Sequence, residues 1–330
     1  MRILVYIERS DVRGGIEIFA ERHVAELKAA GNEVEVANDV RGATFDGFDE
    51  IVVHKCPDVR TLALFPPEKT VYYVHDHEPV CPRTYAYTPF GKNCTRPGGF
   101  FPCVLCAPAC RAWKAALRRV FAQGRRKRVM ARFKRIVVIS EFMKSRLVAN
   151  GIPPDKVEVK PPVLVMPPIP SPLPPPIDLL YVGQLIRGKG VHLLIRAMAR
   201  LKTPRTLDIV GTGNMEPKLK ALAERLGLGG RVRFNGFQPK PQEWMARAAC
   251  VVVPSFWQEP YGLVAAEAVA LGRKVVAFAI GGLPEACQGK ATLVPPGDVK
   301  ALAEALSVRS LRLNDMGVTY GTYSKSIRIC

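Results

Sequence analysis

The sequence predicts an α/β protein with two doubly wound parallel sheets. Short apolar runs that are typical of strands alternate with helical runs along the chain. The alternation stops at residues 161–176, which contain nine prolines, and then resumes. The 330 residues are enough for two separate cores. We therefore expect an N-terminal domain at residues 1–160, a linker at 161–176 and a C-terminal domain at 177–309.

The first half begins with a buried-strand pattern at Arg2–Ile7. Residues at helical spacing follow it, and Gly31 suits the end of that helix because glycine tolerates the left-handed conformation. The residues on the apolar face of this helix are Ile16, Phe19, Ala20, His23, Val24 and Leu27. The next strands are expected at Glu33–Ala37, Ile51–Val53, Val71–Val74 and Ile136–Ile139.

The proline-rich segment lacks backbone donors and favours extended geometry, so it is expected to be a stiff linker. A docking site for a proline-binding module is the alternative. Strands are then expected at Asp178–Val182, Thr206–Val210, Val232–Phe234, Val251–Val253 and Lys274–Phe278. In doubly wound sheets, ligands bind at the carboxyl ends of the strands. Residues 310–330 show no clean helical stripe and are expected to form an atypical tail.

The most informative stretch is residues 254–267, Pro-Ser-Phe-Trp-Gln-Glu-Pro-Tyr-Gly-Leu-Val-Ala-Ala-Glu, which follows an apolar strand. Gly262 allows a ligand to approach the backbone at the start of the next helix. The amides and dipole of that helix start favour a phosphate group. Glu259 and Glu267 are strong acceptors for sugar hydroxyls. This combination predicts a binding site for a nucleotide sugar.

The spacing Glu259-x7-Glu267 in this setting resembles the signature of retaining GT-B glycosyltransferases, family 4 in particular. That family pairs two Rossmann-like domains that face a cleft, and it binds the donor mainly on the C-terminal one. The resemblance implies that Glu259 contacts the donor sugar as a catalytic residue and that Glu267 contacts the ribose. It also implies that the amides of Gly262, Leu263 and Val264 face the diphosphate.

Residues 182–190, Val-Gly-Gln-Leu-Ile-Arg-Gly-Lys-Gly, resemble the donor-phosphate loop of the family. Glycines and cations at a strand end suit a diphosphate. Lys189 stands in the expected place and is assigned a catalytic and donor-binding role. Gln184 stands where the family usually has an arginine, and Arg187 is the candidate to supply the missing charge.

His75 follows the strand Val71–Val74, and by resemblance it is a catalytic histidine of the cleft that orients a sugar hydroxyl. A structural role is the alternative interpretation of this residue. By resemblance, the remaining donor-side candidates are four turn glycines and Phe237, around which the main chain contacts the base, and an ordinary strand and turn is the alternative for Phe237. The glycines are Gly14, Gly15, Gly211 and Gly213. The Gly14-Gly15 pair is not a GxGxxG fingerprint, which argues against a dehydrogenase.

Five cysteines fall within residues 81–110, which are expected to form a long insertion. Cys103 and Cys106 have the spacing of zinc ligands, and Cys81 and Cys94 complete a set of four. Cys110 is a rival ligand. A structural zinc is the hypothesis that we favour, with unligated thiols and a disulfide as the alternatives.

The net charge of +19 favours anionic partners. Residues 111–135 hold eleven basic and no acidic residues, with apolar residues near one helical face. This pattern is typical of a helix that binds an anionic membrane surface, and a solvated basic face is the alternative. No nucleic-acid-binding module is recognisable, so we expect no nucleic-acid partner. No signal peptide or membrane span is recognisable either, so we expect a cytoplasmic protein, peripheral at the inner face of the membrane.

The resemblance implies a retaining hexosyltransferase that uses a nucleotide-diphosphate sugar, carried on UDP or GDP. The acceptor is a glycan or a lipid-linked molecule. No Asp-x-Asp motif is present, so the expected chemistry is metal-independent and needs no cofactor. A sugar-nucleotide epimerase on the same fold and a catalytically inactive binding module are the alternatives.

Overall fold

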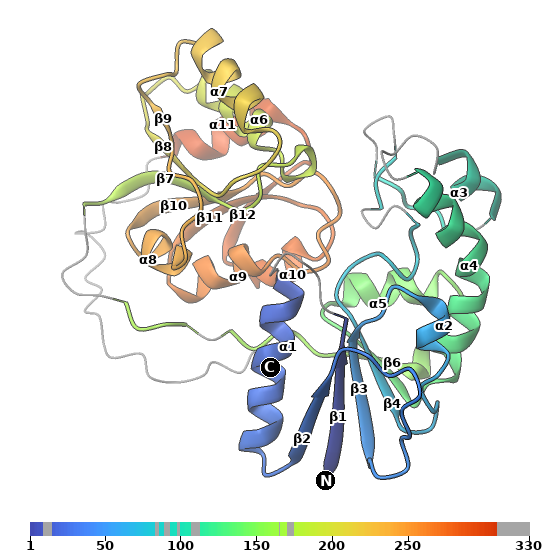
Figure 1. Cartoon of the computed structure of the whole chain (residues 1–330). Coiled ribbons are helices and arrows are strands. Elements are labelled where there is room, and N and C mark those ends of the chain that lie inside the picture. Colours follow the sequence, from blue (N-terminus) through green and yellow to red (C-terminus); the bar gives the residue numbers. More distant parts are fainter. Residues whose placement is uncertain are drawn as a thin grey trace. The chain divides into compact units, whose positions relative to one another are not determined.

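The computed structural model describes residues 1–8, 15–82, 86–88, 93–97, 100–106, 113–164, 166–169 and 175–308. The chain divides into two compact units, Met1–Pro162 and Val163–Cys330. Each unit contains a six-stranded sheet in which every strand pairing is parallel, and helices lie along both faces of each sheet (Figure 1). The predicted pair of doubly wound sheets is therefore confirmed.

The sheet of the first unit has the order β2-β1-β3-β4-β5-β6. Its strands are β1 (Arg2–Ile7), β2 (Glu33–Ala37), β3 (Glu50–Lys55), β4 (Thr70–Val74), β5 (Arg135–Val138) and β6 (Val157–Val159). Its helices are α1 (Gly15–Ala29), α2 (Val59–Leu62), α3 (Phe100–Cys106), α4 (Trp113–Arg132), α5 (Glu141–Val148) and the 3-10 turn η2 (Pro154–Lys156).

Strand alternation divides the core of this unit between the two faces of the sheet. Val71 and Tyr73 of β4 pack with residues of α1, whereas Tyr72 and Val74 pack with residues of α4 and α5. Successive side chains on a strand point to opposite faces, which gives this division. Position 75 continues the row of Val71 and Tyr73, so the chain directs His75 toward the α1 face.

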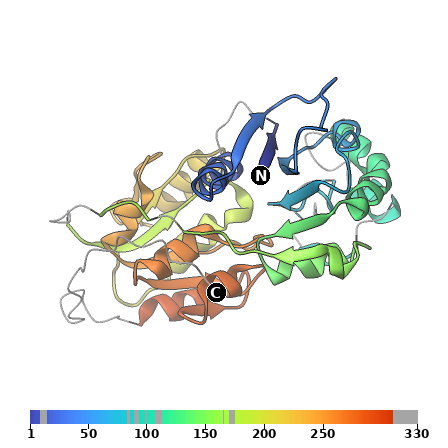
Figure 2. The ribbon, with the colours of Figure 1, turned by 90° about the horizontal axis from the view of Figure 1, so that it is seen from below.

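The sheet of the second unit has the order β12-β11-β10-β7-β8-β9. Figure 2 shows the ribbon from below, with the strands of this unit coloured from light green to red. Its strands are β7 (Ile177–Val182), β8 (Leu207–Val210), β9 (Val232–Phe234), β10 (Ala248–Val253), β11 (Lys274–Phe278) and β12 (Ala291–Val294). Its helices are η3 (Arg187–Lys189), α6 (Val191–Met198), α7 (Glu216–Arg225), α8 (Pro241–Ala246), α9 (Leu263–Ala270), α10 (Leu283–Cys287) and α11 (Val299–Ser307).

Helices α6, α7 and α11 bury the larger core of this unit against one sheet face, where Leu179, Tyr181 and Ile209 are buried. Strands β7, β8 and β9 follow one another toward one edge of the sheet, and β10 then pairs on the other side of β7. Because crossover connections are right-handed, the helices α8, α9 and α10 lie on the other face. The carboxyl ends of β7, β8 and β10 lie side by side, because β7 pairs with both of the others. This edge is where a doubly wound sheet binds its ligands.

Two strands escaped the sequence analysis, and both lie at sheet edges. Strand β6 has only three residues, with Glu158 in the middle, and β12 has the half-exposed Thr292 and Leu293 at its centre. Edge strands bury little apolar surface, so β6 and β12 lack the apolar run of the interior strands, although the other two edge strands, β2 and β9, were predicted. The tail expected at residues 310–330 lies outside the described residues.

The basic segment forms helix α4, but its apolar residues do not share one face as predicted. Val120 is 4% exposed and packs inward, whereas Trp113 and Phe121 are 45% and 67% exposed. Arg126 is buried, and its guanidinium donates to the carbonyl oxygens of Cys56 and Pro57. Part of the positive charge therefore serves the fold of the first unit.

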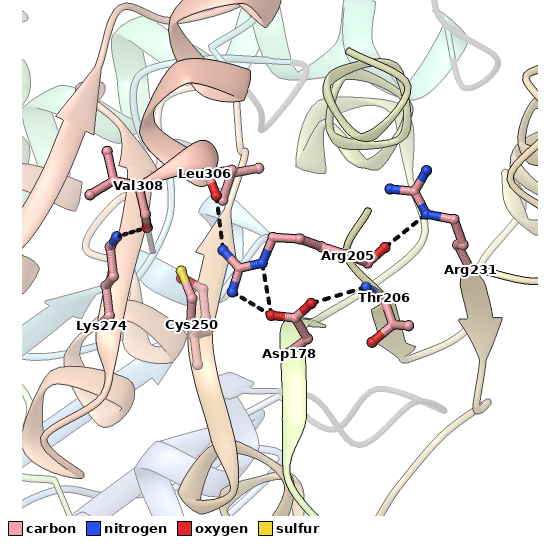
Figure 3. A network of polar contacts seen from close by, with 9 residues as sticks. Asp178, Arg205, Thr206, Arg231, Cys250, Lys274, Leu306 and Val308 are labelled. Carbon is pink, nitrogen blue, oxygen red and sulfur yellow. Dashed lines mark hydrogen bonds and ion pairs between the residues drawn. The ribbon is translucent and has the colours of Figure 1, made fainter. Parts of the chain in front are cut away.

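A polar network ties the start of β7 to the end of α11 in the second unit (Figure 3). Arg205 donates to the carboxylate of Asp178 through two of its nitrogens, and to the carbonyl oxygen of Leu306 at 2.8 Å. The same carboxylate accepts from the amide of Thr206 at 3.1 Å. The Arg205 side chain is only 13% exposed, so these bonds are partly shielded from water.

We expect Arg205→Ala to destabilise the second unit by about 2–3 kcal/mol, because the change leaves a part-buried carboxylate without its cation. For a unit of this size, the loss lowers the melting temperature by about 5–10 °C. Thermal unfolding followed by circular dichroism measures the shift. Arg200→Ala is the matched control, since Arg200 is exposed, and it should leave the melting temperature within about 1 °C. Equal shifts for both variants would contradict the role of the network.

Candidate functional site

The carboxylate of Glu259 is the centre of a hydrogen-bonded cluster after strand β10. Its Oε1 atom accepts from the ammonium of Lys189 at 2.6 Å, the hydroxyl of Ser255 at 2.6 Å and the indole N–H of Trp257 at 2.9 Å. The residue is 7% exposed. No hydrogen bond to Oε2 is found in the described part of the chain. One oxygen is thus fixed by three donors, and the other remains available to a ligand hydroxyl.

Glu259 is held in its charged form. Burial by itself would raise the pKa of this carboxyl, but the charge of Lys189 and the hydrogen bonds from Lys189, Ser255 and Trp257 outweigh burial. The net result is a pKa below the usual 4.5. A carboxylate that stays ionised in a buried place is a strong hydrogen-bond acceptor.

Close packing joins the loop after β7 to the loop after β10. A Cβ atom on Gly188 would lie 2.9 Å from the ring of Trp257, and one on Gly190 would lie 1.8 Å from the carbonyl oxygen of Pro254. Gly190 also has φ 73°, which favours glycine. The Lys189 ammonium lies 5.2 Å from the centroid of the Trp257 ring. The glycines therefore set the position from which Lys189 reaches Glu259.

The predicted turn glycines after β8 also lie at this edge. A Cβ atom on Gly211 would lie 1.9 Å from the carbonyl oxygen of Gly183, and one on Gly213 would lie 2.5 Å from that of Leu185. Gly211 has φ 135° and donates its amide to Gly236 at 2.7 Å. The glycines are thus explained by backbone packing between the loops that follow β7, β8 and β9.

Helix α9 begins beside Glu259, and Gly262 precedes it with φ 117°. Leu263 and Val264 form the first turn. A Cβ atom on Gly262 would lie 2.5 Å from Leu283. Glu267 lies on the same helix and is 8% exposed, and its Oε2 accepts from the side chain of Gln242 at 3.2 Å. Glu259 and Glu267 are therefore both buried carboxylates beside the same helix start.

Several predicted donor-site residues lie outside the Glu259 cluster. Gln184 is exposed, and its carbonyl oxygen accepts from the hydroxyl of Tyr181 at 2.9 Å. Arg187 is exposed and lines a cavity of about 650 Å³ together with Arg196 and Lys218. Phe237 follows β9 and is 74% exposed.

On the N-terminal side, Gly15 is the first residue of α1 and is exposed. Gly14 lies outside the described residues.

His75, in the first unit, lies in a row of hydrogen-bonded aromatic side chains between α1, β3 and β4. Its Nε2 atom lies 3.0 Å from Nδ1 of His54, and Nε2 of His54 lies 3.0 Å from Nδ1 of His23. The Nε2 atom of His23 lies 3.3 Å from the hydroxyl of Tyr73. The predicted histidine is therefore not isolated.

The sequence analysis missed five contributors to the Glu259 cluster and to the row of His75, namely Ser255, Trp257, His23, His54 and Tyr73. Ser255 and Trp257 lie within the stretch that singled out Glu259, but nothing in their spacing indicates that both reach the same oxygen. His23 was placed on the inner face of a helix, and His54 directly follows a predicted strand. The alternation of His54 with Val52 along this strand was the available signal that both side chains face α1.

The predicted zinc site is not supported. The structure describes Cys81, Cys94, Cys103 and Cys106, and among the described residues no group of three or more His, Cys, Asp or Glu side chains could hold a metal ion. Cys103 instead packs with Val104 against the apolar side of α4. The rival ligand Cys110 lies outside the described residues.

The two sheets, their strand order and the loops at the carboxyl ends of β7, β8 and β10 define a GT-B fold, the two-domain architecture of many glycosyltransferases. Residues 176–308, the second unit with its Glu259 cluster, match the family described as "Glycosyl transferases group 1". The family therefore covers the part of the chain in which the predicted donor site lies.

Individual proteins that are similar to this chain in sequence include a named glycosyltransferase and a glycogen synthase. The chain is 37% identical over 161 residues to the D-inositol 3-phosphate glycosyltransferase of Corynebacterium jeikeium, and the match covers 44% of this chain and 38% of the relative. A glycogen synthase of Mycobacterium tuberculosis is 40% identical over 138 residues, which are 40% of this chain and 33% of that protein. The matches thus span little more than a third of these relatives.

Among solved structures, Anabaena HepE in complex with UDP and glucose is similar over 93% of this chain and 89% of its own, with a TM-score of 0.65 and 20% identity. At this identity the likeness concerns the fold. Within the ranges that the structure describes, no helix is both long and apolar enough to cross a membrane.

Proposed function

We propose that this chain is a retaining, family 4 glycosyltransferase that moves a hexosyl group from a nucleotide-diphosphate sugar to an acceptor. The observation that carries the proposal is the carboxylate of Glu259. It is buried and ionised, three donors hold one of its oxygens, and it lies beside a helix start within the family match. Such a group accepts hydrogen bonds from sugar hydroxyls and stabilises positive charge at the reacting carbon.

The departing diphosphate needs cationic and N–H donors. We assign this task to Lys189 and to the amides at the start of α9, from Gly262 to Val264, with no requirement for a metal ion. When a diphosphate binds, the Lys189 ammonium can serve both the phosphate and Glu259, since it has three donors. Glu267 would hold the ribose, the main chain around Phe237 would contact the base, and His75 would bond a substrate oxygen.

Calorimetric titration with UDP and with GDP tests the donor site. We expect micromolar binding of one nucleotide, with UDP favoured because the similar HepE was solved with UDP. Glu267→Ala should weaken this binding at least about tenfold, because two ribose hydroxyls lose a charged acceptor. Glu304→Ala, on the exposed surface of α11, should bind like the wild type. Binding that is equal in all three proteins would refute the ribose role of Glu267.

Turnover separates the proposal from its two rivals. A transferase releases nucleoside diphosphate in proportion to added acceptor. An epimerase would change the donor sugar without an acceptor, and an inactive binding module would bind the nucleotide with no turnover.

The acceptor is proposed to be a glycan or a lipid-linked molecule, and the exposed side of α4 supports the lipid-linked alternative. Five exposed cations recur there at helical spacing, Lys114, Arg118, Arg125, Arg128 and Arg132, and the rings of Trp113 and Phe121 are exposed on the same helix. A cationic stripe on a helix with exposed aromatic rings is typical of a helix that lies on an anionic membrane. The protein would then work at the inner face of the membrane.

Sedimentation with lipid vesicles measures this association. We expect binding to vesicles with about 30% phosphatidylserine and loss of binding in 0.5 M salt, because screening weakens surface charge pairs. A double variant Arg125→Glu/Arg128→Glu should reduce the partition coefficient at least tenfold, since each cation near the surface contributes about 1 kcal/mol. Lys300→Glu on α11 is the control. Unchanged partitioning of the double variant would exclude α4 as the membrane contact.

A further inference from the structure

The row of Tyr73, His23, His54 and His75, here called the histidine row, is continuous from one end to the other. Both ring nitrogens of His23 and of His54 are occupied, one by the preceding member of the row and one by the next. Tyr73 is 6% exposed, His23 7% and His54 2%, whereas His75 is only part-buried. The row therefore starts in the core of the first unit and ends on a partly accessible side chain.

The imidazoles of this row are neutral near pH 7. Burial lowers the pKa of His23 to about 4 and that of His75 to about 3, and burial also lowers the pKa of His54. A neutral imidazole has one N–H and one lone pair. Each nitrogen–nitrogen contact in the row consequently needs a donor on one side and a lone pair on the other.

These conditions leave two arrangements for the row as a whole. In the first, Tyr73 donates to His23, and each histidine then donates through Nδ1–H to Nε2 of the next. In the second, every donor is reversed, and all three histidines carry the proton on Nε2. A mixed arrangement would place two hydrogens, or two lone pairs, against each other at one of the contacts.

The hydroxyl of Tyr73 selects between the two arrangements. Burial raises the pKa of this phenol, so it keeps its proton. Among the described residues, His23 is its only hydrogen-bond partner. In the second arrangement Tyr73 would accept from His23, and its own hydrogen would be buried without an acceptor. An unsatisfied buried donor is unfavourable, which favours the first arrangement by about tenfold or more.

We propose that the histidine row fixes His75 as the Nδ1–H tautomer. Tyr73, His23 and His54 are then positioning residues, and His75 offers a hydrogen-bond donor to an oxygen of the bound substrate. No partner for Nδ1 of His75 is found in the described residues, and the residue is only part-buried. The use of this donor on a substrate rests on the proposed function, whereas the tautomer itself does not.

Nitrogen NMR of the unliganded protein, labelled with ¹⁵N-histidine, tests the tautomer directly at pH 7. The chain has five histidines, so substitution of each one in turn assigns the five ring signals to individual residues. Two-bond ¹H–¹⁵N correlations distinguish a protonated from an unprotonated ring nitrogen. We expect all three histidines of the row to carry the proton on Nδ1. A proton on Nε2 of His75 would overturn the proposal.

Tyr73→Phe removes only the hydroxyl oxygen that selects the direction of hydrogen-bond donation along the histidine row. We expect the Nε2–H population to rise in all three histidines together, because exchanging donor and acceptor at one contact requires the same exchange at the other contacts. Tyr72→Phe is the matched control, since Tyr72 is the neighbouring buried tyrosine on the opposite face, and it should change none of the three. A change confined to His23, or an equal change in both variants, would also overturn the proposal.

A functional measurement keeps this proposal separate from the proposed function. If the chain transfers a sugar, Tyr73→Phe should lower kcat several-fold while leaving the affinity for UDP or GDP unchanged. If no nucleotide binds and no sugar is transferred, the proposed function fails, but the tautomers measured by NMR still decide whether the histidine row acts as described.

Discussion

Replacing Glu259 by alanine is expected to lower kcat/KM for sugar transfer by about 10² to 10³-fold. This is the usual loss when a charged or hydrogen-bonding group that acts on the transition state is removed. The loss should appear mainly in kcat, because an acceptor fixed by three donors is positioned for the charge that develops during the reaction. The measurement is the release of UDP or GDP from the donor that binds, with and without acceptor.

Two further variants separate chemistry from stability. Glu259→Ala leaves Lys189, Ser255 and Trp257 without their common acceptor, so part of its effect comes from a loosened loop. Glu259→Gln keeps an oxygen for these donors but lacks the charge, and it should lose nearly as much activity with a smaller change in melting temperature. Glu304→Ala is the control for a surface glutamate. Transfer at the wild-type rate in Glu259→Ala would refute the assignment of this residue.

The fold was predictable because the interior strands of both sheets are short apolar runs, and these runs alternate with helical patterns along the chain. The interior strand β4 is a case in point, since all five of its residues are buried. The predicted glycines were identified for close backbone approach, and the contacts of Gly190 and Gly211 have this character. The edge strands β6 and β12 lack such a run, because exposed residues interrupt them, and the same is true of the edge strands β2 and β9, which were nevertheless predicted.

The site was predictable only as far as it is local in sequence. Glu259 and Glu267 belong to one strand–turn–helix unit, so their spacing carries a signal. The contact of Lys189 with Glu259 joins residues 70 positions apart, and that of His23 with His54 joins residues 31 apart. Such contacts depend on strand order and on the twist of the sheet, which no periodicity in the sequence reveals. The cysteine spacing likewise indicates possible ligands, but among the described residues no group of three or more metal-binding side chains supports the zinc prediction.

Replacing Lys189 by methionine should both weaken donor binding and change the pH dependence of transfer. Without its ammonium, the diphosphate loses a charged donor, and we expect kcat/KM to fall by on the order of 10²-fold at pH 8. The carboxyl of Glu259 also loses its counter-ion. Burial, which raises the pKa of Glu259, is then opposed only by Ser255 and Trp257. The pKa of Glu259 should therefore rise.

The charged form of Glu259 is the active one in the proposed reaction. This determines in which direction the pH profile of kcat/KM moves in Lys189→Met. In the wild type its pKa is below 4.5, so the carboxyl stays ionised from pH 8 down to pH 5, and this group does not limit activity there. In Lys189→Met the acidic limb of the profile of kcat/KM should move to higher pH, and the variant should lose more activity at pH 5 than at pH 8. Below the raised pKa, activity falls about tenfold per pH unit.

A matched surface variant completes this test. Lys220→Met removes a lysine that is 54% exposed and pairs with Glu216 on α7, so it should change neither the rate nor the pH profile. If Lys189→Met lowers the rate by the same factor at every pH, Lys189 serves the diphosphate alone. The ion pair with Glu259 would then be a feature of the unliganded site, and the charge of Glu259 would depend on its hydrogen bonds to Ser255 and Trp257.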